Sequence, residues 1–446
     1  MHNESIQRVF DRLERVSDWQ LFAFCMLWVI GGGLSLQFIF LPYVVPHAHW
    51  GHGLIAGQDS VGFHLAAVET AHKIRVQGWS AWELTPVNYS IALASAIYAV
   101  TYPEPWVVLP VNGALFGIVI VAVRRLLAVT FDSRATGLVG VTPFFVFPSF
   151  VPIWGQLHRD LNTGAGLSLV LCGLVLAAHK RREAPGILRC SAIALAGVGL
   201  IWLSRSYALA IVAAGTVVFA AVALLTRGCE RVRVSVVALV VVLAAMSSTG
   251  SWTTRMLPPA GTPAAATEVQ TPVAAASVPR GRDSCLPVPG RDIVDRLLYN
   301  LCFVREGFVV DSRRFQAGSG YDYEIRLRTA RDFIAYGPRA VQVALLEPGP
   351  RRWMTETTPV GKLGSYFVPF EMLATYSCLL LAVLVAPKRV ARLEVYALVA
   401  FCLTYTLFYT FVVAQLGTLY RMRAFALAIV VSTALAALVA QLKARE

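Results

Sequence analysis

Charged residues are scarce in this sequence, and their scarcity excludes most soluble proteins. Only 15% of the 446 residues are Asp, Glu, Lys or Arg, whereas 57% are hydrophobic. The apolar residues form runs of about 20, the length that a helix needs to cross the hydrocarbon core of a bilayer. The composition therefore predicts an all-α polytopic membrane protein.

Acidic residues are the scarcer charge, with 26 Asp and Glu against 39 Lys and Arg, a formal net charge of +13. A basic balance of this kind can indicate nucleic-acid binding. Here the basic residues gather at the ends of apolar runs, which is the orientation signal of a membrane protein. We therefore expect a lipid bilayer, and no nucleic acid, as the partner.

Several other features are missing. Residues 1–18 are charged and amphipathic, and the first apolar run has no small-residue cleavage site, so no cleavable signal peptide is expected. Gly31–Gly33 lacks the lysine and the strand–loop–helix context of a phosphate-binding loop, and close helix packing explains it better. No internal repeat and no mid-span group of charges is visible, which disfavours a transporter or lipid flippase.

The positive-inside rule predicts about ten transmembrane helices in an inner or plasma membrane, with both termini cytoplasmic. The segment Tyr89–Thr101 is too short for a span, and we expect it to lie along the outer leaflet as an interfacial helix of the first outer loop. The predicted spans are Gln20–Leu41, Trp106–Arg125, Thr136–Val151, Leu161–Ala178, Leu188–Leu203, Ala208–Leu225, Val234–Met246, Phe367–Val385, Val395–Val413 and Phe425–Ala440.

This topology divides the chain into four parts. A cytoplasmic amphipathic segment (1–19) precedes a transmembrane catalytic module (20–246), and the C-terminal helices (367–446) close the chain. Between them lies a long extracytoplasmic loop, 247–366. Its first part, 257–280, is rich in Ala and Pro and predicts a flexible linker. Its second part, 281–366, predicts a small folded cap.

The cap contains a predicted helix, Tyr323–Tyr336, with one apolar face and three arginines on the other. These arginines have two interpretations. They pair with neighbouring carboxylates on a solvated face, or they form a surface for an anionic lipid headgroup, phosphate or polysaccharide. The cap arginines are Arg326, Arg328 and Arg331, and the neighbouring carboxylates are Asp322, Glu324 and Asp332.

Of eight cysteines, only Cys285 and Cys302 fall in the outer loop, where oxidation is allowed. Closing a loop of this size stabilises a fold by about 3 kcal/mol in the chain-entropy model. We therefore predict a disulfide that anchors the cap. The apolar surroundings of Cys302 leave a buried free thiol as the alternative.

Two carboxylates border the outer ends of apolar segments. Asp59 lies in the polar stretch Gly57–His64, and Asp160 ends the stretch Gly155–Asp160. Either residue alone is explained by a helix N-cap or a loop ion pair. Together, at one face of an otherwise apolar protein, they predict a reaction centre.

The order of these features resembles the GT-C type of membrane glycosyltransferase, which includes protein O-mannosyltransferase-like and lipid A aminoarabinose transferase-like enzymes. The resemblance covers about residues 20 to 230, and no single motif carries it. Several relatives have two acidic residues where this chain has Asp59-Ser60. The stretches that resemble the family are Asp59–Ala66, Leu109–Gly117, Gln156–Asp160 and Arg205.

The resemblance implies inverting transfer of a hexosyl or pentosyl group from a polyprenyl-phosphate donor to a glycan, lipid or protein acceptor at the extracytoplasmic face. Asp59 is then the expected general base, with a pKa raised by desolvation, and Asp160 a helper, acceptor-orienting group or metal ligand. Fixed cations would stabilise the leaving phosphate. The expected cations are Arg205 first, then Arg159, Arg421 and Arg423.

Histidines add weaker candidates. His64 follows Asp59 by five residues and is either its acid–base partner or a plain interfacial histidine. The closely spaced His47, His49 and His52 are either a divalent-metal site or simply polar, and no cofactor is assigned. A polysaccharide polymerase or ligase acting on lipid-linked oligosaccharide is the main alternative function, and a transporter or flippase is the second.

Overall fold

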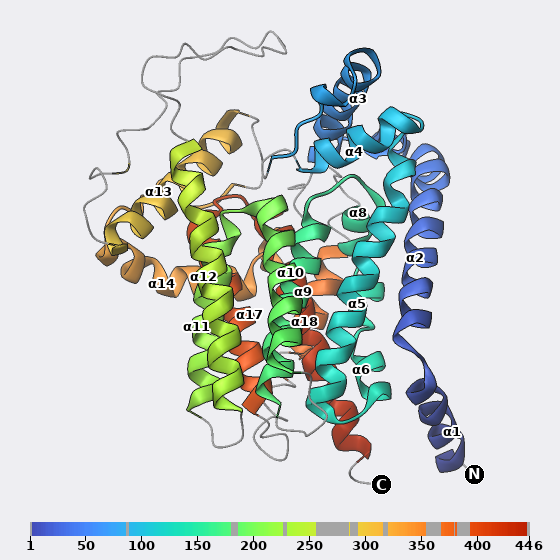
Figure 1. The fold of residues 1–446 in the computed structure, drawn as a ribbon, viewed down its shortest axis with the longest axis vertical. Coiled ribbons are helices and arrows are strands. Elements are labelled where there is room, and N and C mark those ends of the chain that lie inside the picture. The colour runs from blue at the N-terminus through green and yellow to red at the C-terminus, as the bar shows by residue number, and fades with distance from the viewer. Residues whose placement is uncertain are drawn as a thin grey trace.

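The computed structural model describes residues 2–85, 89–179, 186–225, 230–255, 285, 293–314, 320–353, 367–378, 380 and 393–443. The predicted linker 257–280 and the basic residues 180–182 and 388–389 lie outside these ranges. The described part is almost wholly helical (Figure 1). Its helices are α1 (His2–Arg15), α2 (Asp18–Ser35), α3 (Asp59–Gln77), α4 (Tyr89–Val100), α5 (Leu109–Phe131), α6 (Arg134–Gly140), α7 (Pro143–Val146), α8 (Phe150–Gly155), α9 (Asp160–Ala178), α10 (Ile187–Arg205), α11 (Ala208–Leu224), α12 (Arg231–Arg255), α13 (Ile293–Arg314), α14 (Ala330–Leu346), α15 (Pro350–Trp353), α17 (Leu393–Val412) and α18 (Leu416–Lys443).

Seven helices of the described chain are long and apolar enough to cross a membrane, which supports an integral membrane protein. Two shorter apolar helices, α4 and α11, accompany them. The ten spans of the sequence prediction are therefore found only in part. The seven are Asp18–Val44, Pro105–Phe131, Asp160–Ala178, Ile187–Arg205, Arg231–Ser248, Glu394–Val412 and Leu416–Lys443.

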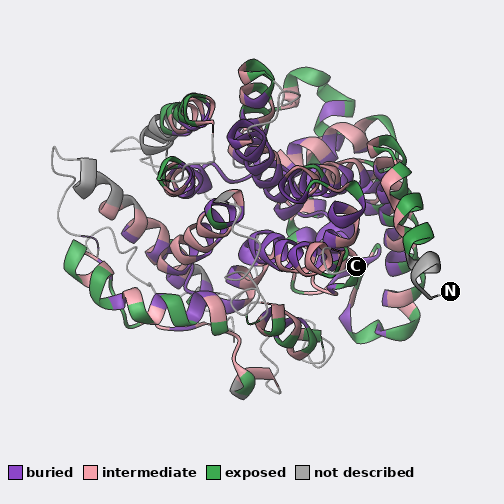
Figure 2. Ribbon diagram, turned by 90° about the horizontal axis from the view of Figure 1, so that it is seen from below, coloured by how far each residue is buried: buried purple, intermediate pink, exposed green. Residues whose placement is uncertain are grey.

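The surface of the bundle is apolar as well as its core. Large apolar side chains of α12 recur on one side at the spacing of a helix face, and Leu239 is 57% exposed. Buried residues concentrate toward the middle of the bundle and exposed ones on its outside (Figure 2). An outward apolar stripe is favourable when lipid is the solvent. The stripe consists of Val232, Val236, Leu239, Leu243 and Met246.

One predicted span is not a continuous helix. The segment Thr136–Val151 is divided among α6, α7 and α8, with turns between them. Pro143 begins α7, and Pro148 lies in the break before α8. A proline inside a helix removes a backbone hydrogen bond and clashes with the preceding turn, so these residues divide the segment.

The segment between α2 and α5 folds at the end of the molecule opposite α1 (Figure 1). It contains an antiparallel hairpin of β1 (His49–Gly51) and β2 (Leu54–Ile55), followed by α3. The α4 helix lies against α3 and does not run along the bundle. Arg75 of α3 fixes the end of α4 by donating to the carbonyls of Ala99 (3.1 Å) and Thr101 (2.9 Å).

At the other end, α1 and the end of α18 lie together (Figure 1). Arg124 and Arg125 both contact Asp18 at 2.6 Å. The sequence placed the end of the second span at this arginine pair, but α5 continues to Phe131. The single Asp18 carboxylate lies between the two guanidinium groups and offsets part of their charge. Lys443 of α18 reaches Glu14 of α1 at 4.0 Å.

The described part of the cap is pinned to the turn between α17 and α18. Arg305 of α13 is 1% exposed, and its guanidinium donates to the carbonyls of Thr410 (3.4 Å) and Asp322 (3.0 Å). The Tyr321 hydroxyl donates to the Val413 carbonyl. These bonds satisfy carbonyls at the end of α17 that have no partner within the helix. Cys285 is disulfide-bonded to Cys302 of α13.

Candidate active site

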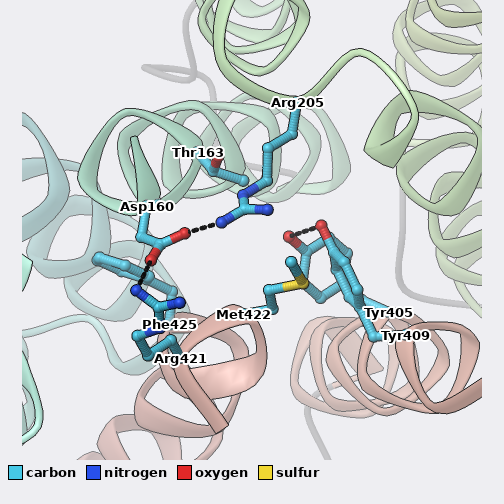
Figure 3. Close-up of a pocket in the computed structure, with 9 residues that line it drawn as sticks. Asp160, Thr163, Arg205, Tyr405, Tyr409, Arg421, Met422 and Phe425 are labelled. Carbon is cyan, nitrogen blue, oxygen red and sulfur yellow. Dashed lines mark hydrogen bonds and ion pairs between the residues drawn. The ribbon is translucent and has the colours of Figure 1, made fainter. Parts of the chain in front are cut away.

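Four helix ends bring charged residues from distant parts of the chain together. Asp59 is the first residue of α3, and Asp160 is the first residue of α9. Arg205 is the last residue of α10, and Arg421 lies near the start of α18. The side chains of Asp160, Arg205 and Arg421 converge on one pocket (Figure 3). We call these four residues, with His158 and Arg159, the charged cluster.

Asp160 and Arg205 form a buried ion pair. The side chain of Asp160 is 3% exposed and that of Arg205 is 2% exposed. A guanidinium nitrogen of Arg205 donates to Asp160 Oδ1, and its other terminal nitrogen donates to the Tyr207 hydroxyl at 2.6 Å. Asp160 Oδ2 has no hydrogen-bond partner among the described residues. This buried oxygen therefore retains the capacity to accept a hydrogen bond.

Arg421 links the two carboxylates. One terminal nitrogen lies 3.2 Å from Asp59 Oδ2, and the other lies 3.9 Å from Asp160 Oδ2. The two acids differ sharply in environment, because the Asp59 side chain is 46% exposed whereas that of Asp160 is buried. The Asp59 carboxylate is thus accessible to solvent, whereas Asp160 lines the buried pocket.

The ionisation of Asp59 differs from the sequence expectation. Burial acts to raise its pKa, but Arg421 and His158 oppose this effect, and the result is a lowered pKa. The expectation that desolvation would raise the pKa overlooked Arg421, which is 362 residues away in the sequence. Asp59 is therefore a carboxylate throughout the physiological pH range.

His158 is part of the site, although sequence reasoning did not select it. It is buried and contacts Gln58 through Nε2 at 3.1 Å and Arg421 through Nδ1 at 3.4 Å. Since a guanidinium only donates, Nδ1 accepts and the proton lies on Nε2. Burial and the Arg421 charge lower the pKa of His158 to about 4, so the imidazole is neutral near pH 7.

The pocket beside Asp160 has one ionic wall and one aromatic wall. Tyr405 and Tyr409 of α17 stand opposite Arg205, and their hydroxyl groups are 3.3 Å apart (Figure 3). Met422 and Phe425 of α18 complete the lining. The space in this structure is sufficient for about one water molecule. A substrate group larger than water therefore needs α17 or α18 to move. Sequence reasoning did not select these tyrosines. Their spacing of one helical turn in an apolar span was the signal that could have identified the aromatic wall.

The charged cluster carries an excess positive charge. Three guanidinium groups stand against two carboxylates, and the neutral His158 adds nothing. The extra cation is Arg159, which lies 5.8 Å from the centre of the Phe63 ring and has no ion-pair partner in the described ranges. Its Nε is buried without a hydrogen-bond acceptor there. Such a cluster favours an anion as its missing component.

Two predicted site residues point elsewhere. His64 is five residues from Asp59, about 140° around the helix, and its Nδ1 lies 3.0 Å from the Tyr98 hydroxyl. Arg423 is buried, and its Nη1 donates to the backbone carbonyls of Val343 (2.8 Å) and Ala344 (2.6 Å) in α14. Its Nη2 donates to the Glu347 carbonyl. Neither residue contacts the charged cluster within the described chain.

The predicted metal candidates do not converge. His49 Nε2 accepts a hydrogen bond from the Gly53 amide at 3.1 Å, and His52 Nδ1 lies 3.1 Å from Glu104. His47 is exposed. Across the residues that the structure describes, no group of three His, Cys, Asp or Glu side chains is arranged to hold a metal ion.

Comparison with known proteins adds no further evidence for a family. No protein-family model, no curated protein and no solved structure matches this chain. The candidate site is therefore interpreted from its own residues and geometry.

Proposed function

We propose that this chain is a GT-C type membrane glycosyltransferase that moves a sugar from a polyprenyl-phosphate donor to an acceptor hydroxyl. The observation that carries the proposal is the charged cluster. Residues from four distant segments join two carboxylates to three arginines at the end of an apolar bundle, with one positive charge in excess. A lipid-linked phosphate supplies the missing anion, and its lipid tail suits the apolar helices.

Each residue has a separate role in this proposal. The acceptor hydroxyl gives its proton to Asp59 while its oxygen bonds to the anomeric carbon. The bond from that carbon to the phosphate oxygen breaks in the same step, so the configuration inverts and polyprenyl phosphate leaves. Asp160 Oδ2 accepts a hydrogen bond that orients the acceptor. Arg159, Arg205 and Arg421 stabilise the negative charge that develops on the phosphate.

The low pKa of Asp59 is compatible with this role. A weak base removes a hydroxyl proton late, when the new bond to carbon has already made that proton acidic. The neighbouring Arg421 holds the carboxylate ionised and fixes its direction. Asp59 is thus in its ionised, proton-accepting form throughout the physiological pH range.

The proposal includes an orientation. The end that bears α3 and α4 is extracytoplasmic, and both termini are cytoplasmic. Reporter fusions at Arg125 and Arg231 are expected to report the cytoplasm, and fusions at Asp59 and Asp160 the outer side. If Arg125 and Asp59 report the same compartment, the orientation and the donor-binding face are both wrong.

The decisive experiment is a transfer assay with purified protein in proteoliposomes. Polyprenyl-phosphate monosaccharides are supplied as donors, and Asp59→Asn is expected to lower the rate by about 10²–10⁴, the usual contribution of a general base. Glu69→Gln is the matched control, because Glu69 is an exposed carboxylate on the same helix and pairs only with Lys73 in the described chain.

Three outcomes would contradict the proposal. Asp59→Asn with the rate of the unsubstituted protein would remove Asp59 as the base. Transfer only from polyprenyl-linked oligosaccharide would identify a polymerase or ligase. Movement of the lipid-linked sugar between leaflets, without any new glycosidic bond, would identify a flippase.

A further inference from the structure

The cap helix α14 has an exposed apolar side. Ile334 is 76% exposed and Val341 46%, and these two residues, seven apart in the sequence, lie on one side of the helix. The opposite side is buried, with Tyr336 and Ala340 inside the protein. A two-sided helix whose outer side is apolar needs a partner other than water.

The position of α14 identifies the kind of surface that it meets. Its buried side packs on the last turns of α17, where the rings of Phe333 and Phe411 are 5.5 Å apart and those of Tyr336 and Phe411 are 5.9 Å apart. Since α17 ends at Val412, α14 lies level with the end of a candidate span. The helix runs across the direction of the bundle (Figure 1). Its contact with the last turns of α17 and its direction across the bundle are those of a helix lying in a membrane surface.

The cap arginines stand at the start of this helix, and Arg326 and Arg331 are exposed. The described residues show only part of the pairing of the cap arginines with nearby carboxylates, one of the two interpretations from the sequence. Backbone hydrogen bonds and then the Arg328 charge lower the pKa of Asp332, whereas neither Arg326 nor Arg331 forms an ion pair with a described carboxylate. Asp322 instead contacts Arg339 at 3.0 Å, and Glu324 lies 3.7 Å from Arg313. Asp332 accepts backbone hydrogen bonds at the helix N-terminus. The positive charges of Arg326 and Arg331 are thus accessible to an external anion.

We propose that α14 is an interfacial helix that binds the outer surface of the bilayer. Its side bearing Ile334 and Val341 inserts among acyl chains, and the exposed Arg326 and Arg331 bind the phosphates of anionic lipids. Apolar contact and basic charge act together in such helices. This lipid-binding surface does not include the charged cluster. Arg423 of α18 bonds the backbone of α14, whereas Arg421 bonds Asp59 in the cluster.

The first test measures depth. The full-length protein carries an environment-sensitive fluorophore at Ile334→Cys and is reconstituted as single copies in phosphatidylcholine nanodiscs. The control position is Glu324→Cys in the same cap, because the Glu324 side chain is 94% exposed. Labelled protein without either substitution gives the background from native cysteines. Lipid with a nitroxide on its acyl chain is expected to quench the Ile334 probe, and aqueous iodide the Glu324 probe.

The second test measures charge. Adding phosphatidylglycerol to the nanodiscs is expected to shift the Ile334 probe further toward an apolar environment. Each arginine near an anionic surface contributes about fivefold to binding, so Arg326→Gln/Arg331→Gln is expected to bind this lipid about 25-fold more weakly. Inorganic phosphate added to phosphatidylcholine nanodiscs is expected to cause no shift. A shift with phosphate alone would identify a soluble anion as the ligand and overturn the lipid assignment.

Two further outcomes would overturn the proposal. Iodide quenching of the Ile334 probe as strong as that at Glu324, with none by the nitroxide lipid, would place α14 in water. Protection of Ile334 only in nanodiscs that hold two copies would show that a second copy of the chain covers this side.

Discussion

Replacing Arg205 separates the structural role of its ion pair from its proposed role in catalysis. Arg205→Met removes the guanidinium that faces Asp160, whose side chain is 3% exposed. An unpaired buried carboxylate is costly, and breaking a buried ion pair typically destabilises a protein by about 3–5 kcal/mol. The single variant is therefore expected to unfold at a much lower denaturant concentration than the unsubstituted protein.

The double variant Asp160→Asn/Arg205→Met removes both charges at once. Replacing a buried pair by neutral groups of similar size is often close to neutral, so most of the lost stability is expected to return. Transfer activity is not expected to return, because the donor phosphate has lost a cation and the acceptor has lost its orienting carboxylate.

Both quantities are measured on the same preparations. Unfolding in detergent is followed by tryptophan fluorescence, and transfer is followed with a polyprenyl-phosphate sugar. A double variant that regains stability and also turnover would show that the pair only holds the helices together. A single variant with unchanged stability would refute the argument from burial.

Three other expectations follow from the charges and contacts. Because His158 has a pKa of about 4 and the pKa of Asp59 is lowered, kcat/KM is expected to stay constant from neutral pH to about pH 5 and to fall toward pH 4. In the unfolded chain the pKa of a histidine is about 6.5. The free energy of unfolding is therefore expected to decrease as the pH falls from about 6.5 to about 4, and acid unfolding measures this decrease. Alkylation with mass mapping is expected to leave Cys285 and Cys302 unlabelled without reductant, and labelling of both would disprove the disulfide. Arg423→Ala is expected to expose the backbone of α14 to hydrogen exchange, since each lost charge-assisted bond contributes about 1.5–3 kcal/mol.

Much of the helical architecture could be predicted from the sequence, because long apolar runs between basic residues leave few alternatives. The segment Thr136–Val151 is the exception. Its hydropathy resembles that of a span, but Pro143 and Pro148 interrupt the backbone hydrogen bonds. Hydropathy describes how side chains partition between water and lipid, and it does not describe backbone hydrogen bonding. The positions of the two prolines were therefore the only sequence feature that could predict the break.

The site was harder to predict, since its members meet only in three dimensions. Asp59, Asp160 and Arg205 were selected because each borders an apolar segment. Arg421 and Arg423 could not be told apart, because side-chain direction two residues apart differs by about 200° on a helix and the rotation of α18 is set by tertiary packing. His158 was overlooked because its role depends on Arg421, which is distant in sequence.

The hydrogen bonds from Arg423 to α14 limit how parts of this protein can be recombined with other proteins. Excising the cap, or exchanging it for the loop of another protein, would remove the carbonyls of Val343 and Ala344 and leave the buried Arg423 guanidinium without these oxygen acceptors. Cap and bundle are therefore not interchangeable modules. A chimera that takes the cap from elsewhere needs the first turns of α18 from the same source, or an apolar residue in place of Arg423.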